Sequence, residues 1–447
     1  MRSSLLPLAI SAFASVGAAL DPVEVYGNKF FNKDGSQFFM KGVAYQLRPT
    51  DPFVDTDQCK RDASLMKELG VNTIRTYHVD PNGSHDGCMK AFDDAGIYVL
   101  LDLDTFETYI NSTHLQWDQG QYDAYAKVMD KFHGYDNVLG FFIANEGIAA
   151  RGQSQVAPYL KAAARDMKAY RDNKGYRKIP IGYSAAHIIE MQPMLQDFLT
   201  CGGDDKNIID FYAINSYSWC DPSTYENSAY DKLQKYAQDF PVPIFFSETG
   251  CNTHPPRLFG DQDAIFGKEM INDISGALIY EWIEETNNYG LVTYGKADSG
   301  PDVEEGFVRK GTPTPVVPDF ENLKQKWATI KPTGVKKADY TPKPSTRPCP
   351  SSTDGGWWQV PGNVKLPTIG QAFTGSYSTA APSPTGSSTG KAGGSDGNNG
   401  GKTQGSGDAG KDGKDGKGDK SAAIRDKQIT IAGSALSVLV LGAALLL

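Results

Sequence analysis

The chain has 447 residues, a formal net charge of −9 at pH 7, 22 Tyr, 21 Phe and six Trp. The negative charge disfavours nucleic acids and other polyanions as partners. No GxGxxG or Walker pattern occurs in the sequence, so the usual phosphate-binding motifs of nucleotide enzymes are missing.

The N-terminus is typical of a secretory signal peptide. Arg2 precedes an apolar run over residues 5–16, and the small residues 17–19 (GAA) follow it. We expect a signal peptide over residues 1–19, cleaved near Ala18 or Ala19. Beyond it, residues 23–41 predict a β-hairpin, because residues 32–35 (NKDG) supply turn chemistry.

From residue 38 onward, apolar runs alternate with amphipathic helical stretches. Eight such strands predict an α/β fold, a (β/α)8 barrel, which we assign to residues 20–338. A doubly wound sheet is the structural alternative, although it more often begins with a Gly-rich phosphate loop. The expected strands lie near 38–45, 71–77, 97–103, 138–145, 179–184, 209–215, 242–248 and 277–282. The expected helices include 62–69, 122–132, 156–171 and 231–240.

Two glutamates stand where predicted strands end. Glu146 follows the fourth strand and Glu248 closes the seventh. Burying a carboxylate beside apolar runs costs free energy, so a carboxylate at such a place is expected to serve a function. In barrels of this kind the catalytic groups gather at the carboxyl ends of the strands. Two carboxylates that share a cleft are the minimum equipment for cleaving a glycosidic bond. The alternative is that each Glu caps a helix or pairs with a surface lysine.

The two glutamates suit different tasks in a retaining mechanism. Glu146 suits the acid/base, because the neighbouring Asn145 can hold a sugar 2-hydroxyl. Glu248 suits the nucleophile. We expect Tyr280, near the end of the eighth strand, to donate a hydrogen bond to Glu248, and core packing is the alternative for this tyrosine.

The cysteines and sequons fit the secretory route. Six cysteines predict three disulfides, and their spacing leaves fifteen pairings open. The absence of CxxC and the scattered His make a structural zinc site improbable, so we expect no metal. Asn82 and Asn111 begin N-glycosylation sequons.

The C-terminal part loses the barrel's periodicity. We expect an extension over residues 339–374 that Cys349 ties to the barrel, and then a low-complexity stalk over 375–421 that spaces the enzyme from the membrane. Small residues from Ser421, the candidate attachment residue, and an apolar tail with no basic residue after it predict a glycolipid-anchor signal over 422–447. A C-terminal membrane helix is the alternative.

Several motifs together resemble glycoside hydrolase family 72, the fungal glycolipid-anchored β-1,3-glucanosyltransferases. The resemblance covers residues 21–349. The motifs are 42–46 (GVAYQ), 74–77 (IRTY), 140–146 (GFFIANE), 180–184 (PIGYS), 246–252 (FSETGCN), 256–259 (PRLF) and 284–292 (EETNNYGLV).

The resemblance implies Glu146 as acid/base and Glu248 as nucleophile, the roles already reached from the strand ends. It implies that six residues line the sugar subsites: Gln46, Tyr77, Asp102, Asn145, Tyr217 and Tyr280. It also implies three disulfide pairs: Cys59–Cys88, Cys201–Cys349 and Cys220–Cys251.

The chain departs from the family pattern in two places. After residues 182–184, many relatives carry an acidic residue and then an Arg that contact substrate, whereas this chain has His187 and Gln192. This substitution puts in doubt the subsite that the loop contributes. Only Cys349 lies beyond the barrel, so the chain resembles the branch without the Cys-rich carbohydrate-binding module.

The expected function is elongation of cell-wall β-1,3-glucan by transfer of one chain's new reducing end to another chain. We expect donor and acceptor glucans as partners, no cofactor, a monomer, and a location at the outer leaflet of the plasma membrane or in the wall. Transfer rather than hydrolysis rests on the resemblance. The alternatives are a secreted endo-β-1,3-glucanase and a glucan-binding wall protein without turnover.

Overall fold

A computed structural model describes residues 19–342 and 347–375. The predicted signal peptide, except Ala19, lies outside the described residues. The same is true of the predicted stalk, apart from residue 375, and of Ser421 and the anchor signal. These assignments therefore stay predictions.

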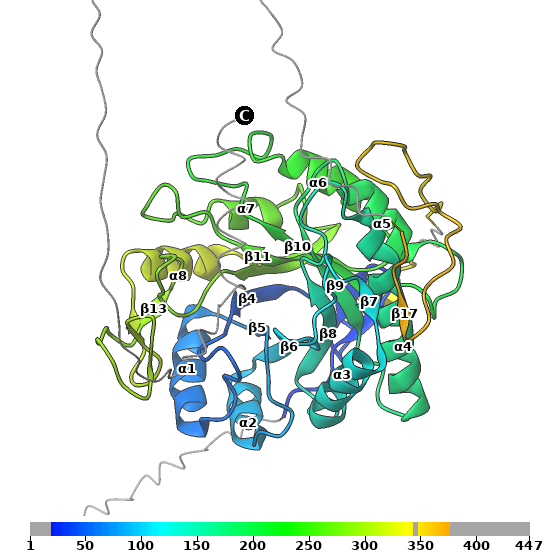
Figure 1. Ribbon diagram of the computed structural model, residues 1–447. Coiled ribbons are helices and arrows are strands. Elements are labelled where there is room, and N and C mark those ends of the chain that lie inside the picture. Colours follow the sequence, from blue (N-terminus) through cyan, green and yellow to red (C-terminus); the bar gives the residue numbers. More distant parts are fainter. Residues whose placement is uncertain (1–18, 343–346, 376–447) are drawn as a thin grey trace, which may run out of the picture. The chain divides into compact units, whose positions relative to one another are not determined.

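Eight parallel strands close into a barrel, which confirms the predicted fold class (Figure 1). The closing pair joins the first barrel strand to the last, because Gly42 pairs with Leu278. Every expected strand is present. In order around the barrel they are β4 (Met40–Ala44), β5 (Thr73–Thr76), β6 (Tyr98–Asp102), β8 (Val138–Asn145), β9 (Ile181–Ala186), β10 (Phe211–Ser216), β11 (Ile244–Thr249) and β12 (Ile274–Ile279).

Helices surround the barrel (Figure 1). Their ends follow local chemistry: Asp118 and Gln121 form a capping box at the start of α3, and Gly70 ends α1 with a φ of 94° that favours glycine. The helices are α1 (Thr56–Leu69), α2 (Asp86–Ala95), α3 (Gln119–Phe132), α4 (Ala157–Asn173), α5 (Gln192–Thr200), α6 (Tyr230–Ala237), α7 (Asp261–Ile265) and α8 (Asp319–Thr329). The four helical stretches expected from the sequence lie within or overlap α1, α3, α4 and α6.

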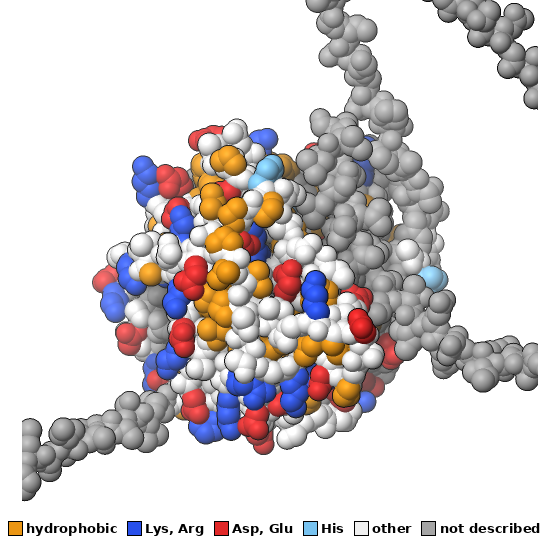
Figure 2. Space-filling model, turned by 90° about the vertical axis from the view of Figure 1, so that its left-hand side faces the viewer, with side chains coloured by type: hydrophobic (Ala, Val, Ile, Leu, Met, Phe, Trp, Pro, Cys, Tyr) orange, Lys and Arg blue, Asp and Glu red, His pale blue; other side chains and the backbone are white. Residues whose placement is uncertain are grey.

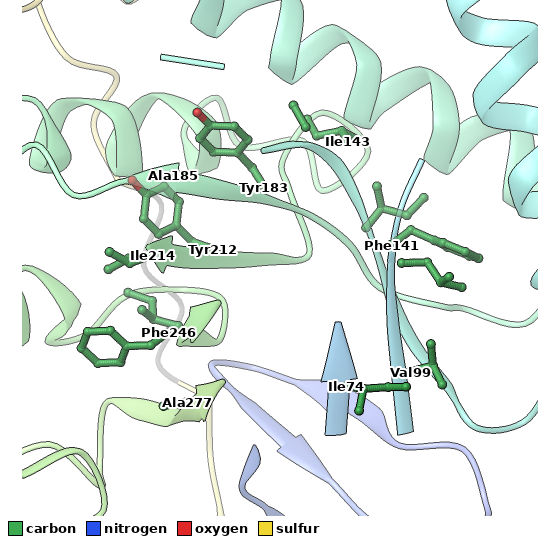
Figure 3. Packing of buried hydrophobic residues seen from close by; sticks show 14 of the residues in the cluster. Ile74, Val99, Phe141, Ile143, Tyr183, Ala185, Tyr212, Ile214, Phe246 and Ala277 are labelled. Carbon is green, nitrogen blue, oxygen red and sulfur yellow. The ribbon is translucent and has the colours of Figure 1, made fainter. Parts of the chain in front are cut away.

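Neighbouring residues of one strand serve two different cores. Phe246 points outward into the large cluster between barrel and helices, and Phe245 points into the barrel, as the period of two in a strand requires (Figure 3). Phe30 reaches Phe245 with ring centroids 6.1 Å apart. Phe30 belongs to the expected hairpin, which is the first part of a three-stranded antiparallel sheet of β1 (Glu24–Tyr26), β2 (Lys29–Phe31) and β3 (Gln37–Phe38). This sheet therefore contributes to the inner core.

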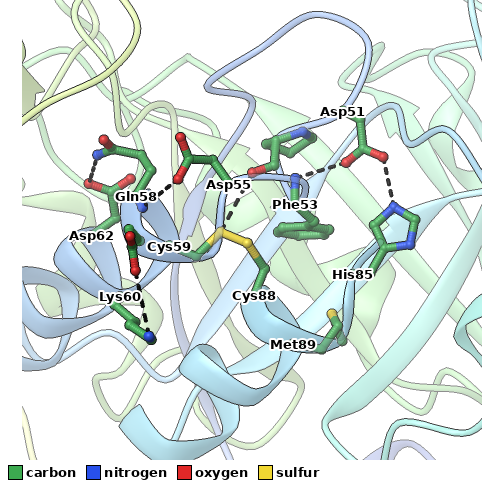
Figure 4. Close-up of a disulfide and its surroundings, with 12 residues drawn as sticks. Asp51, Phe53, Asp55, Gln58, Cys59, Lys60, Asp62, His85, Cys88 and Met89 are labelled. Atoms are coloured by element: carbon green, nitrogen blue, oxygen red, sulfur yellow. Dashed lines mark hydrogen bonds and ion pairs between the residues drawn. A yellow bond between two sulfur atoms is a disulfide. The ribbon is translucent and has the colours of Figure 1, made fainter. Parts of the chain in front are cut away.

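Three disulfides join the same pairs that the family resemblance implied. Cys59–Cys88 links α1 to α2 beside Phe53, and nearby the buried His85 lies 2.7 Å from Asp51 (Figure 4). Cys220–Cys251 links the loops that follow β10 and β11, on the carboxyl side of the barrel.

The C-terminal extension packs on the barrel's helices. Cys349 is bonded to Cys201 at the end of α5, and Trp358 is buried against Phe198 with ring centroids 5.3 Å apart. Further on, β17 (Gln371–Ala372) pairs with β7 (Gln116–Trp117), which precedes α3. The extension is thus fastened at two places.

The long connection between β12 and α8 forms short antiparallel pairs. They are β13 (Val292–Thr293) with β16 (Thr314–Pro315), and β14 (Val303–Glu304) with β15 (Phe307–Val308). Two 3-10 turns, η1 (Ser154–Val156) and η2 (Lys337–Asp339), complete the elements of the described chain. On the face in Figure 2, charges of both signs are interspersed around a run of hydrophobic side chains.

Surface and membrane features complete the description. Asn82 is exposed and Asn111 is partly exposed, so both sequons are at the surface, and their glycosylation stays a prediction. No helix within residues 19–342 and 347–375 is both long and apolar enough to span a bilayer. Over the same ranges, His, Cys, Asp and Glu side chains form no group of three or more that could hold a metal ion.

Candidate active site

Glu146 and Glu248 lie at the carboxyl end of the barrel, where the sequence predicted them. Glu146 follows the last residue of β8, and Glu248 is the fifth of six residues in β11. The strands β9 and β10 separate them around the barrel. Asn215 of β10 pairs with Glu248 across the sheet and donates from Nδ2 to Glu146 Oε1 at 2.9 Å. Asn215 therefore contacts both glutamates: its backbone pairs with that of Glu248, and its side chain donates to Glu146.

Glu248 is a buried carboxylate held by two tyrosines. The hydroxyl of Tyr77 donates to Oε1 at 2.8 Å, and the hydroxyl of Tyr217 donates to Oε2 at 2.6 Å. The guanidinium of Arg75 lies 3.5 Å from Oε1. Glu248 is 6% exposed, so these donors replace the hydrogen bonds to water that its oxygens lose on burial. Its oxygens are fixed in direction, as a nucleophile requires.

Arg75 is a buried cation that contacts four polar residues of the site in addition to its own strand: Asp102, Ser184, Asn145 and Glu248. It forms a two-pronged ion pair with Asp102, with Nε–Oδ1 at 3.0 Å and Nη2–Oδ2 at 2.7 Å. It also donates to Ser184 Oγ at 3.1 Å and to Asn145 Oδ1 at 3.0 Å. The nearby carboxylate of Asp102 raises the pKa of Arg75 although burial opposes this, so the guanidinium stays charged.

The surroundings of Asn145 decide which way its amide faces. Its side-chain oxygen Oδ1 accepts from Arg75 and from Asn215 Nδ2, both at 3.0 Å. Both of these partners are N–H groups that can only donate, so the amide must present its oxygen to them and not its NH2 group. The Nδ2 group is therefore the end left for the open side, where Asn145 is exposed. This arrangement suits a donor to a sugar hydroxyl.

Glu146 has the properties of a general acid. Burial, and then the negative charge of Glu248, raise its pKa from 4.5 to about 7, against the hydrogen bond from Asn215. Its backbone has φ 47°, a left-handed conformation that is rare outside glycine, and its N–H donates to Ser184 O at 2.9 Å. The two carboxyl groups thus have different environments: Glu146 has a raised pKa, whereas Glu248 accepts hydrogen bonds from two tyrosines. Such a difference is typical of a general acid that lies beside a nucleophile.

The predicted subsite residues divide into two groups. The first group faces the site: Tyr77 and Tyr217 bond Glu248, and Asn145 is exposed on the open side. Gln46 and Asp102 act on other protein groups. Gln46 Oε1 accepts from the N–H of Tyr77 at 2.8 Å and its Nε2 donates to main-chain carbonyls, so it joins two loops. Asp102 is 2% exposed and binds Arg75, so its place favours positioning over contact with sugar.

Tyr280 differs from the expectation. Its hydroxyl is hydrogen-bonded to Glu281, and its ring packs edge-on against Tyr217 and Tyr289, with centroids 6.1 Å and 5.5 Å apart. The bonds to Glu248 come from Tyr77 and Tyr217 instead. Tyr280 still packs in a cluster of three tyrosines with Tyr217, which bonds Glu248, and Tyr289.

The divergent loop after β9 is polar and largely buried. His187 accepts or donates at Nδ1 with Ser216 Oγ at 2.9 Å, while burial lowers its pKa to about 4. Gln192 is 3% exposed, and neither of its amide atoms has a partner. Ser216 is the last residue of β10 and lies between Asn215 and Tyr217 in the chain. Through His187 the divergent loop therefore contacts the end of β10 that carries these two residues.

Three residues of this network were missed by the sequence analysis: Arg75, Ser184 and Asn215. Arg75 lay within a quoted motif, and a charged residue inside an otherwise buried strand was a usable signal. Asn215 ends a strand as Asn145 does, which was a second signal. Ser184 also lay within a quoted motif, but its residue type gave no signal, since a small hydroxyl residue is common in strands.

The family was established by comparison with known proteins. The model of a family described as Glucanosyltransferase, glycoside hydrolase family 72, matches residues 12–331. The chain belongs to this family. Similar proteins include the 1,3-beta-glucanosyltransferase gel1 of Aspergillus fumigatus, 38% identical over 83% of this chain and 80% of gel1. Protein EPD1 of Candida maltosa is 37% identical over 82% of this chain, and the matched part covers about two thirds, 66%, of EPD1.

Solved structures of a family 72 member share the fold. Gas2 in complex with a compound superimposes with a TM-score of 0.70 at 37% identity, covering 78% of this chain and 77% of Gas2. A glutamate-to-glutamine mutant of Saccharomyces cerevisiae Gas2 in complex with laminaritetraose and laminaripentaose has a TM-score of 0.67 at 36% identity, over 76% and 73% of the two chains.

Proposed function

We propose that this chain is a retaining 1,3-β-glucanosyltransferase with Glu146 as acid/base and Glu248 as nucleophile. The observation that carries the proposal is the difference between the two carboxyl groups. One is held by Tyr77 and Tyr217 beside Arg75, and the other has a pKa of about 7. Membership of family 72 and the glucanosyltransferase names of relatives support the substrate class.

In the first step Glu248 attacks the anomeric carbon of an internal β-1,3 bond. Glu146 gives its proton to the glycosidic oxygen, so the leaving chain departs with a 3-hydroxyl and the other part stays bound as a glycosyl ester. The Nδ2 of Asn145 donates to the 2-hydroxyl of the sugar being attacked, a contact that strengthens in the transition state.

In the second step the 3-hydroxyl at the non-reducing end of another glucan attacks the ester carbon. Glu146, now a carboxylate, accepts the hydroxyl proton, and Glu248 leaves. The two inversions restore the β-linkage. Tyr217, on the β10 loop, lies beside the nucleophile together with Tyr280 and Tyr289. These rings offer apolar faces on which an acceptor glucan stacks and displaces water.

Product sizes test this proposal. The whole chain, expressed through a fungal secretory host, is incubated with a reduced laminari-oligosaccharide of roughly ten glucose units, and products are sized by chromatography. We expect products both shorter and longer than the substrate. Shorter products alone would support the endo-β-1,3-glucanase, and an unchanged substrate peak with retained glucan binding would support the wall protein without turnover.

We further propose that the mature protein is a monomer on the outer leaflet of the plasma membrane, attached by a glycolipid at Ser421. The small residues 421–423 (SAA) and the apolar run that comes after them support this location. Treatment of intact cells with a phosphatidylinositol-specific phospholipase should release the enzyme into the medium. Retention after treatment, with a known anchored protein released in the same sample, would contradict the glycolipid anchor.

A further inference from the structure

The loop between β8 and α4, residues 147–156, begins directly after Glu146, and we call it the β8 loop. Its far end is bonded to the C-terminal extension. Ser154 is fully buried, and its Oγ accepts from the main-chain N–H of Gln359 at 3.0 Å. The neighbouring Gln155 donates from Nε2 to Gln359 Oε1 at 3.4 Å. These bonds join positions that are 205 and 204 residues apart in the chain, so only the folded extension can supply them.

Arg151 makes a further attachment of the same loop. Its guanidinium donates to the main-chain carbonyl of Gly355 and lies over the ring of Trp357, 5.8 Å from the ring centroid. A guanidinium within about 6 Å of an indole face is attracted to it electrostatically. The β8 loop therefore meets one short segment of the extension, residues 355–359, which we call the strap.

The strap is fixed to the barrel on both sides. Before it, Cys349 is bonded to Cys201 at the end of α5. Within it, Trp358 is 1% exposed and packs on Phe198 of α5. After it, β17 pairs with β7, and Figure 1 shows the extension, in orange, beside α4 and α5. Because the extension is anchored on both sides of the strap, the strap can hold the β8 loop in one place.

The start of the β8 loop needs such support. Glu146 has φ 47°, and a residue other than glycine keeps a left-handed backbone only where the surrounding structure over-determines it. Two long hydrogen bonds tie the loop to its neighbours. They run from the N–H of Ile148 to the hydroxyl of Tyr183 at 3.3 Å, and from Gln153 Nε2 to Ser112 Oγ at 3.4 Å. The buried 3.0 Å bond to the strap is shorter than both.

We propose that the strap positions the acid/base: by holding the β8 loop it fixes the backbone of Glu146 and keeps its carboxyl group directed at the glycosidic oxygen. Arg151, Ser154 and Trp357 are then positioning residues, because they act through Glu146. The inference rests on the proposed function and gives the C-terminal extension a part in it. The acid/base is thus held by a segment that follows it by about two hundred residues.

Release of the β8 loop has a specific signature, because its surroundings set the pKa of Glu146. Burial is the first cause of the raised pKa and the charge of Glu248 is the second, whereas the hydrogen bond from Asn215 and the charge of Arg75 lower it. These three neighbours belong to barrel strands, so only the burial of Glu146 should change when the loop is released. Water that reaches the carboxyl group lowers its pKa, and the alkaline fall of kcat/KM moves to lower pH.

Arg151→Ala combined with Ser154→Ala releases the β8 loop from the strap. We expect kcat for transfer between laminari-oligosaccharides to fall about tenfold to a hundredfold, the cost of misplacing a catalytic group by about 1 Å, with KM changed less than about twofold. The midpoint of the alkaline fall in kcat/KM should move down by about one pH unit. An aryl laminari-oligosaccharide, whose leaving group needs no proton, should lose much less of its rate of aryl release.

Arg165→Ala is the matched control. Arg165 of α4 donates from Nη2 to the carbonyl of Pro367 at 2.9 Å, so this variant also removes an arginine bond to the extension, but outside the strap. It should lower the melting temperature without moving kcat or the pH midpoint. Trp357→Ala approaches the contact from the extension and leaves every residue of the β8 loop in place. It should shift the pH midpoint in the same direction as the double variant.

The outcomes separate the two proposals. If wild-type protein elongates glucan and the strap variants keep its kcat and pH midpoint, the strap is refuted and the proposed function stands. Equal losses in Arg165→Ala would also refute it, because the extension would then support the fold as a whole. If wild-type protein shows no transfer, hydrogen exchange of the amides in the β8 loop decides. Faster exchange in Trp357→Ala than in Arg165→Ala would keep the hold of the strap on the loop and overturn only the enzyme assignment, and equal exchange would overturn both.

Discussion

Replacing Glu248 with glutamine is expected to lower transfer to below about one thousandth of the wild-type rate, because removing a nucleophile abolishes the covalent route. Glutamine has the same shape: its oxygen accepts from the hydroxyl of one of the two tyrosines, Tyr77 or Tyr217, and its NH2 group donates to the hydroxyl oxygen of the other. Arg75 retains its two-pronged ion pair with Asp102, so no buried cation is left alone. The variant should therefore fold and still bind glucan.

The measurement combines chromatography of the oligosaccharide products with calorimetric binding of the substrate. Glu226→Gln is a matched control, since Glu226 is exposed on the loop after β10. Full transfer by the Glu248 variant would exclude this residue as nucleophile. Loss of binding together with unfolding would show a structural role instead.

The second large effect concerns Glu146 and has a pH signature. With a pKa of about 7, the general acid is protonated below that pH and loses its proton above it. The wild-type kcat/KM is therefore expected to fall as pH rises through about 7. Glu146→Gln should lower transfer between natural glucans by about 10²–10⁴-fold, the usual contribution of acid–base catalysis.

An activated substrate distinguishes this role from a structural one. An aryl laminari-oligosaccharide whose leaving group needs no proton should form the glycosyl ester with the variant, and azide, which needs no base, should then release a β-glycosyl azide. We expect no such rescue for Glu248→Gln. Failure of azide to accelerate the Glu146 variant, or formation of an α-linked product, would contradict the assignment.

The same variant should be more stable than the wild type in mildly alkaline solution. The folded-state pKa of Glu146 is raised, so its charged form is disfavoured in the folded chain, and stability is lost as pH rises from about 4.5 through about 7. Glutamine removes this term, which is on the order of 3–4 kcal/mol at about 1.4 kcal/mol per pKa unit. The two proteins should unfold at similar temperatures near pH 4, where both side chains are neutral.

Much of the architecture was predictable because it depends on short-range patterns. Runs such as 138–145 and 242–248 are apolar over the length of a buried strand, and consecutive runs are spaced widely enough for a helix to lie between them. Glu146 and Glu248 were conspicuous for the same reason, since each interrupts such a run at its end. Their catalytic roles stay predictions.

The polar network was less predictable because its partners are distant in sequence. Arg75 meets Asp102 across 27 positions, Ser184 across 109 and Glu248 across 173. Nothing in the local sequence of a strand states which inward side chains will meet when the barrel closes. Tyr280 illustrates this. The strand pattern predicted its position near the end of the eighth strand, but not that its hydroxyl is hydrogen-bonded to Glu281 and not to Glu248.

The sequence by itself determined the barrel, the two strand-end glutamates and the family, since strand and helix periods and contiguous motifs are read locally. Spacing left fifteen disulfide pairings open, and only the resemblance selected one set. The tertiary structure decided which donors hold Glu248, and it produced the burial and then the nearby charge of Glu248 that raise the pKa of Glu146. These contacts join residues that are distant in sequence, because hydrogen bonds and Coulomb interactions act over a few ångströms whatever the separation along the chain.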